Sequence, residues 1–258
     1  EDYGVTWTRL AEGVDGFGIA IEEDPHEPNL LFLGTELGLW VSVDRGASWA
    51  LWSHVPRMAI DDLEVHARDD DLVLGTHARG AWVIDDISGL RAVAAGADLD
   101  AMGGDVQAVA PGRVGILHPV AEAIGYRSTG MAMWQGETRP RGVFLQWLAG
   151  EGAGETTLDE VDAVGRPVWS DEQASAPGLN RVVWNLRAGE VAADHPELAP
   201  GRDVLPGRYL LRVTSGGRSS SVEFEVIDDP RVPAPSIQER IEENAAWRER
   251  LRERRGGA

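Results

Sequence analysis

An internal repeat of about 42 residues constrains the fold of this chain more than any other feature. The stretch GTELGLWVSVD, residues 34–44, matches GTHARGAWVIDD, residues 75–86, with one inserted residue in the second copy. The offset is 41 residues at the first Gly and 42 at the following Gly, Trp and Asp. An independent match of DYGVTW, residues 2–7, to DRGASW, residues 44–49, has the same offset of 42. Chance would rarely match three positions at one spacing twice, so the chain contains repeated structural units.

Each unit holds four short apolar stretches at strand length. In the first complete unit they lie at residues 18–21, 30–33, 39–43 and 48–52. In the second they lie at 60–65, 72–74, 81–84 and 90–93. A period in the forties with four strands per unit is typical of a β-propeller blade. The sequence therefore predicts an all-β fold in which residues 1–95 form two blades of a β-propeller.

The turn between the third and fourth stretches of the first unit has the pattern S-x-D-x-G-x-[ST]-W, the Asp box. The Asp carboxylate can accept backbone N–H groups across the turn, Gly can supply a positive φ, and Trp can cover the junction. Because a repeated residue in a repeated turn belongs to the scaffold, we expect a structural role rather than catalysis or metal binding. The complete copy is Ser42, Asp44, Gly46, Ser48 and Trp49, and an earlier partial copy is Asp2, Gly4, Thr6 and Trp7.

With these motifs, residues 1–95 resemble the closing blades of the sortilin-like and BNR-repeat (Asp-box) superfamily, which includes xyloglucanases, sialidase-like proteins and bacterial chains of the "glycosyl hydrolase, BNR repeat" type. The most specific stretch is LEVHARDDDLVLGTHARGAWVIDDISGLR, residues 63–91. The resemblance implies an exported bacterial protein that continues into a β-sandwich and a helical tail. It also implies further N-terminal blades as partners of this segment. In the enzymatic relatives the catalytic acids lie on blades that are not present here.

The sequence of the second half of the chain predicts three segments. These are a connector over residues 96–112, an immunoglobulin-like or fibronectin-like β-sandwich over 113–229 and a helical tail over 230–258. Strand-length apolar runs lie at 142–148, 157–163, 181–186, 209–214 and 221–227. Several short strands within about a hundred residues are typical of such a sandwich. The composition Ser-Gly-Gly-Arg at 215–218 predicts a hairpin turn. For the polar stretch 188–205 we expect a solvated loop, although its clustered carboxylates leave a calcium site conceivable.

The tail begins with a capping box, Ser236 followed by Glu239, ahead of apolar residues at helical spacing. Its C-terminal arginines complement the helix dipole. Because glutamates interleave with them, a salt-bridged helix is favoured over a nucleic-acid patch.

Composition excludes several classes of function. The formal net charge is −19, and such a field repels phosphate backbones, so we expect no nucleic-acid partner. There is no Cys and no apolar run of 18 residues, so we predict no disulfide, no thiolate metal site and no membrane span. Phosphate-loop, zinc and serine-nucleophile motifs are absent, and we expect no cofactor. Since the chain begins inside a repeat motif, we expect a fragment of a secreted, periplasmic or cell-surface protein.

Two hypotheses for function follow. In the first, the segment is a non-catalytic scaffold and docking module for protein or glycan. In the second, it is the structural end of a glycan-degrading glycoside hydrolase, whose chemistry needs paired carboxylates. We expect no complete active site in the segment itself, and the identity of any ligand stays open. The candidate ligand-facing residues are Glu36, Glu64, His66, His77 and Asp86, with Trp52 and Trp134 as candidate platforms for sugar stacking.

Overall fold

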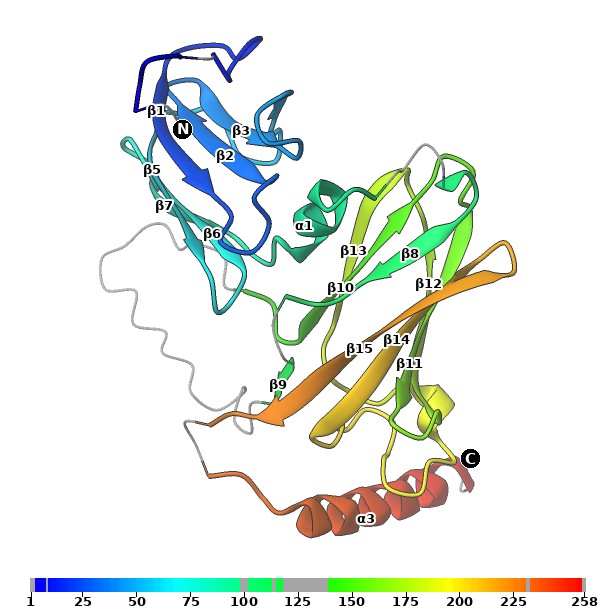
Figure 1. The fold of residues 1–258 in the computed structure, drawn as a ribbon. Coiled ribbons are helices and arrows are strands. Elements are labelled where there is room, and N and C mark those ends of the chain that lie inside the picture. Colours follow the sequence, from blue (N-terminus) through cyan, green and yellow to red (C-terminus); the bar gives the residue numbers. More distant parts are fainter. Residues whose placement is uncertain are drawn as a thin grey trace. The chain divides into compact units, whose positions relative to one another are not determined.

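The computed structural model describes residues 3–7, 9–97, 102–112, 115–117, 139–230 and 233–256. The chain divides into two compact units, Glu1–Asp98 and Leu99–Ala258. The protein is mostly β with a long C-terminal helix (Figure 1). Among the described residues, no helix is long and apolar enough to cross a membrane.

The first unit contains two antiparallel meanders (Figure 1). The first sheet has the order β1 (Gly18–Glu23), β2 (Leu31–Thr35), β3 (Gly38–Ser42) and β4 (Ala50–Leu51). The second has the order β5 (Ile60–His66), β6 (Asp71–Thr76) and β7 (Gly80–Ile84). These seven strands lie where the apolar stretches predicted them, within a few residues at each end.

The two sheets repeat each other in register as well as in sequence. In the first sheet Ile21 pairs with Leu33, and Leu33 pairs with Trp40. In the second sheet the same row is formed by Leu63, Leu74 and Trp82. Both sheets also contain a β-bulge at the same place in the repeat, between Gly18 and Ala20 and between Ile60 and Asp62. The repeat in the sequence is therefore a repeat in three dimensions.

The prediction of a fourth strand near residues 90–93 is wrong, because this segment is helix α1 (Ser88–Ala94). The second copy of the repeat lacks the Gly and the Trp that follow Asp44 in the first copy and complete its Asp-box turn. Asp86 instead accepts hydrogen bonds from the backbone N and Oγ of Ser88, at 3.1 and 2.6 Å, at the start of the helix. The residues LRAVA that follow favour a helix, and the chain becomes helical at this point.

The core of the first unit lies between the two sheets. It is formed by alternate side chains of each sheet, together with Ile87 and Ala94 around α1. The sheets approach closely at Gly34, where a Cβ would lie 2.9 Å from Cγ2 and from the carbonyl oxygen of Ile60. A side chain there would force the sheets apart. The buried members from the strands include Phe32, Leu39, Val41, Ile60, Leu63, Val65, Leu72 and Leu74.

The second unit packs two sheets around an aromatic core. One sheet has the order β13 (Gly178–Trp184), β10 (Val143–Ala149) and β8 (Val106–Val109). The other has the order β12 (Pro167–Ala174), β11 (Glu155–Asp162), β14 (Gly207–Ser215), β15 (Arg218–Asp228) and β9 (Gly115–Leu117), of which only β9 is parallel to its neighbour. In the core, Trp184 packs against the rings of Tyr209 and Phe224.

Three strands of this unit, β8, β9 and β12, were not predicted. β8 lies inside residues 96–112, where the sequence predicted only a connector, so that expectation is wrong for these four residues. Its sequence VQAV is too short to show a period, and its partner β10 provides the pairing. β12 has few apolar residues because alternate residues are exposed. The hairpin turn is confirmed: Ser215 pairs with Arg218, and Gly216 and Gly217 have φ of 56° and 80°.

The expectation of a solvated loop over residues 188–205 is also wrong, because this segment joins the core. Ala192, Leu198, Ala199 and Val204 are buried, and so is His195. Nδ1 of His195 accepts the backbone N–H groups of Glu197 and Leu198, at 3.1 and 3.2 Å. The proton of the ring is therefore on Nε2, which lies 3.1 Å from Oδ2 of Asp162.

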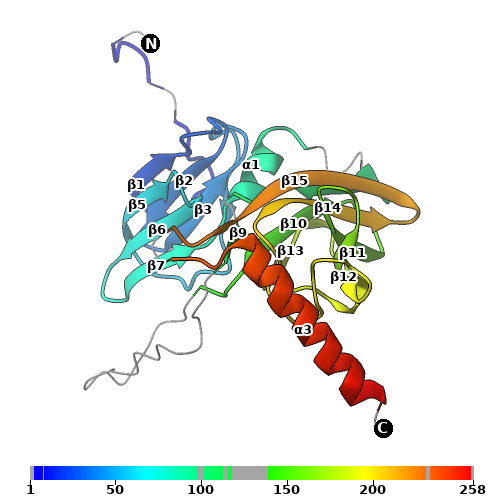
Figure 2. The same cartoon turned by 90° about the horizontal axis from the view of Figure 1, so that it is seen from below.

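Helix α3 (Ile237–Gly256) begins with the predicted capping box. The Ser236 Oγ accepts the backbone N–H of Glu239 at 3.2 Å, and a Glu239 oxygen accepts the backbone N–H of Ser236 at 2.7 Å. The backbone N–H and the Oγ–H of Ser236 both donate to the carboxylate of Glu239 and hold its pKa below the usual value. The helix runs beside the loop 188–205 (Figures 1 and 2), and Asn244 and Trp247 donate to the carbonyl groups of Glu197 and Pro200.

Candidate docking surface on the first unit

The first sheet has two apolar faces, and only one of them packs against the second sheet. Phe32, Leu39 and Val41 point into the core between the sheets. Because side chains alternate along a strand, their neighbours Leu31, Leu33 and Trp40 point to the opposite face, which we call the outer face. Cross-strand pairing extends this face from β1 to β4, in the row Ile21, Leu33, Trp40 and Leu51.

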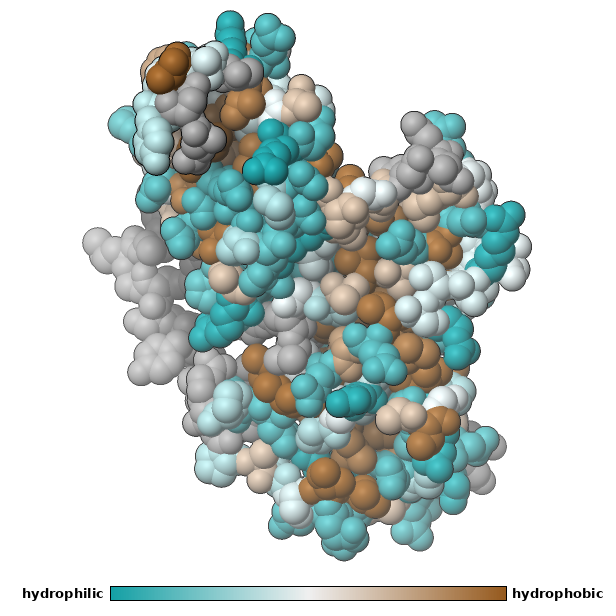
Figure 3. All heavy atoms as spheres, in the orientation of Figure 1, coloured by the Kyte–Doolittle hydropathy of each residue, from teal (hydrophilic) through white to brown (hydrophobic). Residues whose placement is uncertain are grey.

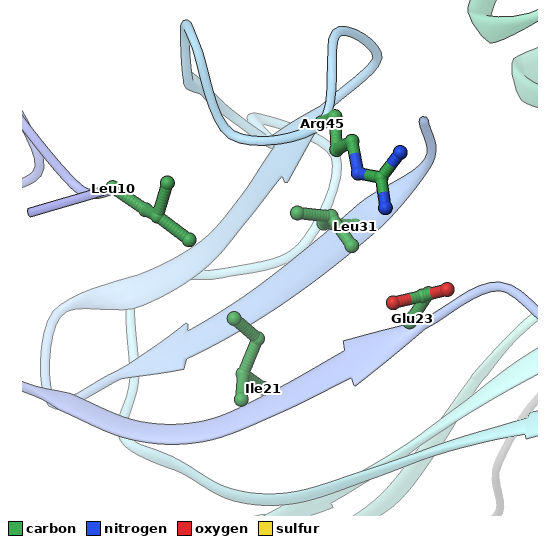
Figure 4. Close-up of a pocket in the computed structure, with 5 residues that line it drawn as sticks. All are labelled: Leu10, Ile21, Glu23, Leu31 and Arg45. Carbon is green, nitrogen blue, oxygen red and sulfur yellow. The ribbon is translucent and has the colours of Figure 1, made fainter. Parts of the chain in front are cut away.

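The outer face is open at the β1 side of the sheet. Ile21 is 60% exposed and Leu10, which lies over the same face, is 50% exposed. Between them is an open pocket of about 470 Å³ lined by Leu10, Ile21, Glu23, Leu31 and Arg45 (Figure 4). In the close-up the three apolar side chains surround one space, and Glu23 and Arg45 lie at one end of it. The floor of the site is therefore apolar, with one acidic and one basic group at its rim.

Other exposed apolar side chains belong to the same region of sequence. Phe17, Ile19 and Leu37 are each at least 40% exposed, and Ile19 lies in β1, the edge strand of its sheet. In the space-filling view, brown apolar residues show at the surface of the first unit among teal polar ones (Figure 3). A contiguous exposed apolar patch on a folded protein marks an interaction site, whereas single exposed apolar residues do not.

The Asp box holds the turn between β3 and β4. Asp44 accepts the backbone N–H of Ser48 at 2.8 Å and the Oγ–H groups of Ser48 and Ser42 at 2.6 and 2.7 Å. The hydrogen bonds from Ser48 come first among the causes that hold the pKa of Asp44 below its usual value of 3.8. Gly46 has φ of 87°, and the indole Nε1 of Trp49 donates to the Leu10 carbonyl at 2.7 Å. The Asp box thereby fixes Leu10 over the outer face.

A buried ion triad joins the β1–β2 loop to the β5–β6 turn and to α1. Arg91 of α1 donates through Nε to both carboxylate oxygens of Asp24 at 2.8 Å, and it also pairs with Asp70. Asp24 belongs to the β1–β2 loop and additionally accepts the backbone N–H groups of His26 and Glu27. Asp70 belongs to the β5–β6 turn. The triad therefore joins both sheets to the helix.

The structure separates the candidate ligand-facing residues. Glu36 and His77 lie in equivalent turns of different sheets, and His77 Nδ1 is 3.4 Å from Asp61 Oδ2 at an exposed position. Glu64 and His66 are exposed on β5, on the side away from the core. Asp86 is buried and holds the start of α1.

The remaining candidates do not gather into a site either. Trp52 is half-buried and packs against the core between the sheets, with its ring 5.7 Å from that of His54. Gly4 has φ of 82° and Trp7 is exposed, with its Nε1 donating to the Gly4 carbonyl. Thr6 is exposed beside them. Asp2 and Trp134 lie outside the described residues. Within the described ranges, no three His, Asp or Glu side chains are grouped so as to hold a metal ion.

The outer-face residues were not among the predicted site residues. The sequence gives only the spacing, since Ile21 stands 42 residues before Leu63, and the structure adds that Leu63 is buried in the core whereas Ile21 is exposed. When a residue is exposed in one copy of a repeat and its equivalent is buried in the other copy, the exposed residue indicates a candidate binding surface.

Comparison with known proteins adds little to this description. No protein-family model and no curated protein matches the chain. PorZ, a surface component of the type-IX secretion system of Porphyromonas gingivalis, matches with a TM-score of 0.26 and 18% identity over 80% of this chain and 22% of its own. The BSP domain of a biofilm-associated protein matches with a TM-score of 0.25 and 19% identity over 37% of this chain and 14% of its own. The chain thus spans less than a quarter of either protein, and neither likeness carries an argument about its fold or function.

Proposed function

We propose that this chain is a non-catalytic scaffold and docking module of an exported bacterial protein. The observation that carries the proposal is the open pocket at the β1 side of the outer face, where Ile21 is 60% exposed although its repeat equivalent Leu63 is buried. In the first unit, the carboxylates of Asp24, Asp44, Asp70 and Asp86 hold turns, a helix start and an ion triad. Such an arrangement supports binding rather than chemistry.

Within this proposal, the first unit is the end of a β-propeller of the BNR (Asp-box) type. The four-stranded meander, the 42-residue repeat of register and bulge and the Asp-box hydrogen bonds support it. The second unit is an immunoglobulin-like sandwich. Its two sheets around a tryptophan core support this, as does Tyr209, whose Oη donates to the carbonyl of Leu205 four residues earlier, as in a tyrosine corner.

The proposed absence of catalysis is tested by incubating the full chain with xyloglucan and with sialosides. We expect no release of reducing sugar or sialic acid above a buffer blank. Turnover that is abolished by Glu64→Gln or by Asp86→Asn would contradict the proposal and place catalysis on the second sheet. Turnover that survives both substitutions would also contradict it and place the catalytic groups elsewhere in the chain.

The proposed docking role is tested with a fluorescent dye that binds exposed apolar surface. We expect the full chain to bind the dye and Ile21→Lys to lower the fluorescence at least about twofold, since the substitution places a charge in the apolar wall of the pocket. The matched control is Val83→Lys, because Val83 is 52% exposed on the second sheet. Equal fluorescence of the two variants would mean that the outer face is not the exposed apolar site.

A further inference from the structure

We infer that protonation of His195 releases helix α3 from loop 188–205, so that acidification uncovers a surface that the helix covers at neutral pH. The inference concerns the second unit and does not depend on the docking role proposed for the first. It is drawn from one buried imidazole ring, the hydrogen bonds of its two nitrogens and the peptide groups that lie between this ring and α3.

The neutral form of the His195 ring holds the backbone of the loop. Its side chain is only 3% exposed, and Nδ1 accepts the backbone N–H groups of Glu197 and Leu198. Since Nε2 donates to Asp162, a second proton would have to bind to Nδ1. A protonated Nδ1 is a donor, so it would face two backbone donors and both hydrogen bonds would be lost.

The two peptide groups that donate to the His195 ring also bind α3. The N–H of Glu197 shares its peptide group with the carbonyl of Pro196, which accepts Nη2 of Arg248 at 2.7 Å. The N–H of Leu198 shares its peptide group with the carbonyl of Glu197, which accepts Nδ2 of Asn244 at 2.9 Å. In a planar trans peptide the N–H and C=O point in opposite directions. Any rotation that turns the N–H groups away from Nδ1 therefore also moves the carbonyl groups on which α3 docks.

Helix α3 covers part of the core at this place. Ile241 packs against the core cluster of the second unit, and Asn244 is 3% exposed. Trp247 is half-buried and donates to the carbonyl of Pro200, which belongs to the same loop. The other ion pairs of the helix, Arg240 with Asp228 and Arg202 with Glu243, involve no histidine. Release of α3 therefore uncovers the apolar side chain of Ile241 and the loop carbonyl groups.

The charges around the ring determine the direction of the effect. Asp162 attracts an imidazolium, but Nε2 already donates to it in the neutral ring, so protonation adds attraction without a new hydrogen bond. Arg166, whose Nη1 is 3.9 Å from the same carboxylate oxygen, weakens that attraction. The charged and titratable groups near the ring come from β11 and its turn, from β14, from the loop and from α3, and they are Glu160, Asp162, Arg166, Tyr209, Asp194, Glu197 and Arg248.

The loss of two hydrogen bonds then outweighs the attraction to Asp162, and the docked state favours the neutral ring. A free imidazole takes up a proton at about pH 6.5. Docking is therefore at full strength above this pH and weakens as the pH falls below it. Glu160 acts in the opposite sense, because its burial raises its pKa and its protonation stabilises the core. The release should accordingly be confined to the helix and the loop.

Hydrogen exchange of the full chain, measured by mass spectrometry, tests the inference. The protection factor of the amides in residues 237–256 is compared at pH 7.5 and pH 5.0, after correction for the intrinsic effect of pH on exchange. We expect α3 to lose protection about tenfold or more at the lower pH, whereas β10 and β14 change by less than about twofold.

The test variant is His195→Asn, because the side-chain oxygen of Asn accepts nearby backbone N–H groups and does not titrate. We expect its α3 protection to change by less than about twofold over the same range of pH. His77→Asn is the matched control and should keep the full response, because His77 is exposed in the first unit. Should His195→Asn fail to fold, the ring of His195 is titrated by NMR in the unaltered chain, and its midpoint should coincide with the midpoint of α3 release.

Four outcomes would overturn the inference. The first is α3 protection that is the same at both pH values. The second is an equal loss of α3 protection in His195→Asn. The third is a midpoint for protonation of His195 that differs from the midpoint of α3 release. The fourth is loss of protection in β10 and β14 together with α3, because it would show unfolding of the whole unit.

Discussion

Asp44 shows how a single carboxylate can look functional while holding a turn. Its acceptor oxygens serve the backbone and hydroxyl groups of Ser48 and the hydroxyl of Ser42. We expect Asp44→Ala to lower the free energy of unfolding of the full chain by about 0.5–2 kcal/mol, as for other side chains that cap backbone donors. Chemical denaturation measures this, with the exposed Asp15→Ala as control. Unchanged stability would show that the turn does not depend on Asp44.

The pH dependence of this contribution follows from the sign of the pKa shift. The pKa of Asp44 is lower in the folded protein than its usual value of 3.8. Its stabilising contribution is therefore fully present above that value and is lost as the pH falls through the folded pKa. The difference in stability between the protein and Asp44→Ala should accordingly shrink on acidification.

Glu160 presents the opposite case. It lies in β11 at a bulge, it is 0% exposed, and neither carboxylate oxygen has a hydrogen-bond partner among the described residues. Burial, followed by the charge of Asp159, raises the pKa of Glu160 well above its usual value of 4.5. Because the folded state holds the proton more tightly, stability is highest below pH 4.5 and falls as the pH rises toward the folded pKa.

We therefore expect Glu160→Leu to stabilise the protein at pH 8 by about 1–3 kcal/mol, the usual penalty for a buried polar group left unpaired. Melting temperatures from pH 5 to pH 9 measure this, and the variant should lose the decline that this group causes at high pH. Glu172→Gln, an exposed carboxylate of the neighbouring strand, is the matched control. A variant that melts below the unaltered protein at pH 8 would show that Glu160 has a partner that stabilises it.

At the scale of elements, Arg91 decides whether α1 stays on the two sheets. Removing Arg91 leaves the carboxylates of Asp24 and Asp70 buried without a cation. We expect Arg91→Ala to lower stability by about 3–5 kcal/mol, the usual effect of breaking a buried ion pair from one side. The control is Arg68→Ala, because Arg68 pairs with Asp69 at the surface, where such pairs contribute about 0.2–1 kcal/mol. Equal losses in urea melts would argue against the triad as the link between the elements.

The elements also show what sequence reasoning reached. All seven strands of the first unit were predicted from short apolar stretches, and the repeat shows each of them twice except β4, whose equivalent segment is helix α1. Helix α1 was missed because its residues continue the strand spacing of the first unit, and only the contact of Asp86 with Ser88 reveals the change. Loop 188–205 was predicted as solvated from its carboxylates, whereas its Ala, Leu and Val residues enter the core. The bulge that places Glu160 inside leaves no mark on the sequence.

For the whole molecule, the repeat predicted the strands of the first unit but not which of their side chains would be exposed. Exposure depends on which neighbours are present, and no single residue type encodes it. Ile21 looks like any core residue of a strand until its equivalent Leu63 is seen to be covered by a sheet.

The two units should behave differently when they are produced as separate fragments. We expect residues 99–258 to be monomeric and to melt cooperatively, since this unit has its own closed core. Residues 1–98 should self-associate, because Ile21, Leu10 and the β1 edge are exposed. Light scattering after size-exclusion chromatography and thermal melts measure both. A monomeric 1–98 fragment with a cooperative melt would contradict the propeller assignment.

The docking of α3 has a consequence for the timing of folding during synthesis. The carbonyl groups of His195, Pro196, Glu197 and Pro200 take their donors from α3, at separations of 47 to 53 residues. The ribosome makes the loop well before it makes the helix, and buried carbonyl groups require partners. Until α3 has emerged from the ribosome, water must donate hydrogen bonds to these four carbonyl groups. Loop 188–205 therefore lacks its contacts with α3 during this time. Any slowing of translation over residues 237–256 would prolong the interval in which the aromatic core of the second unit is accessible to chaperones.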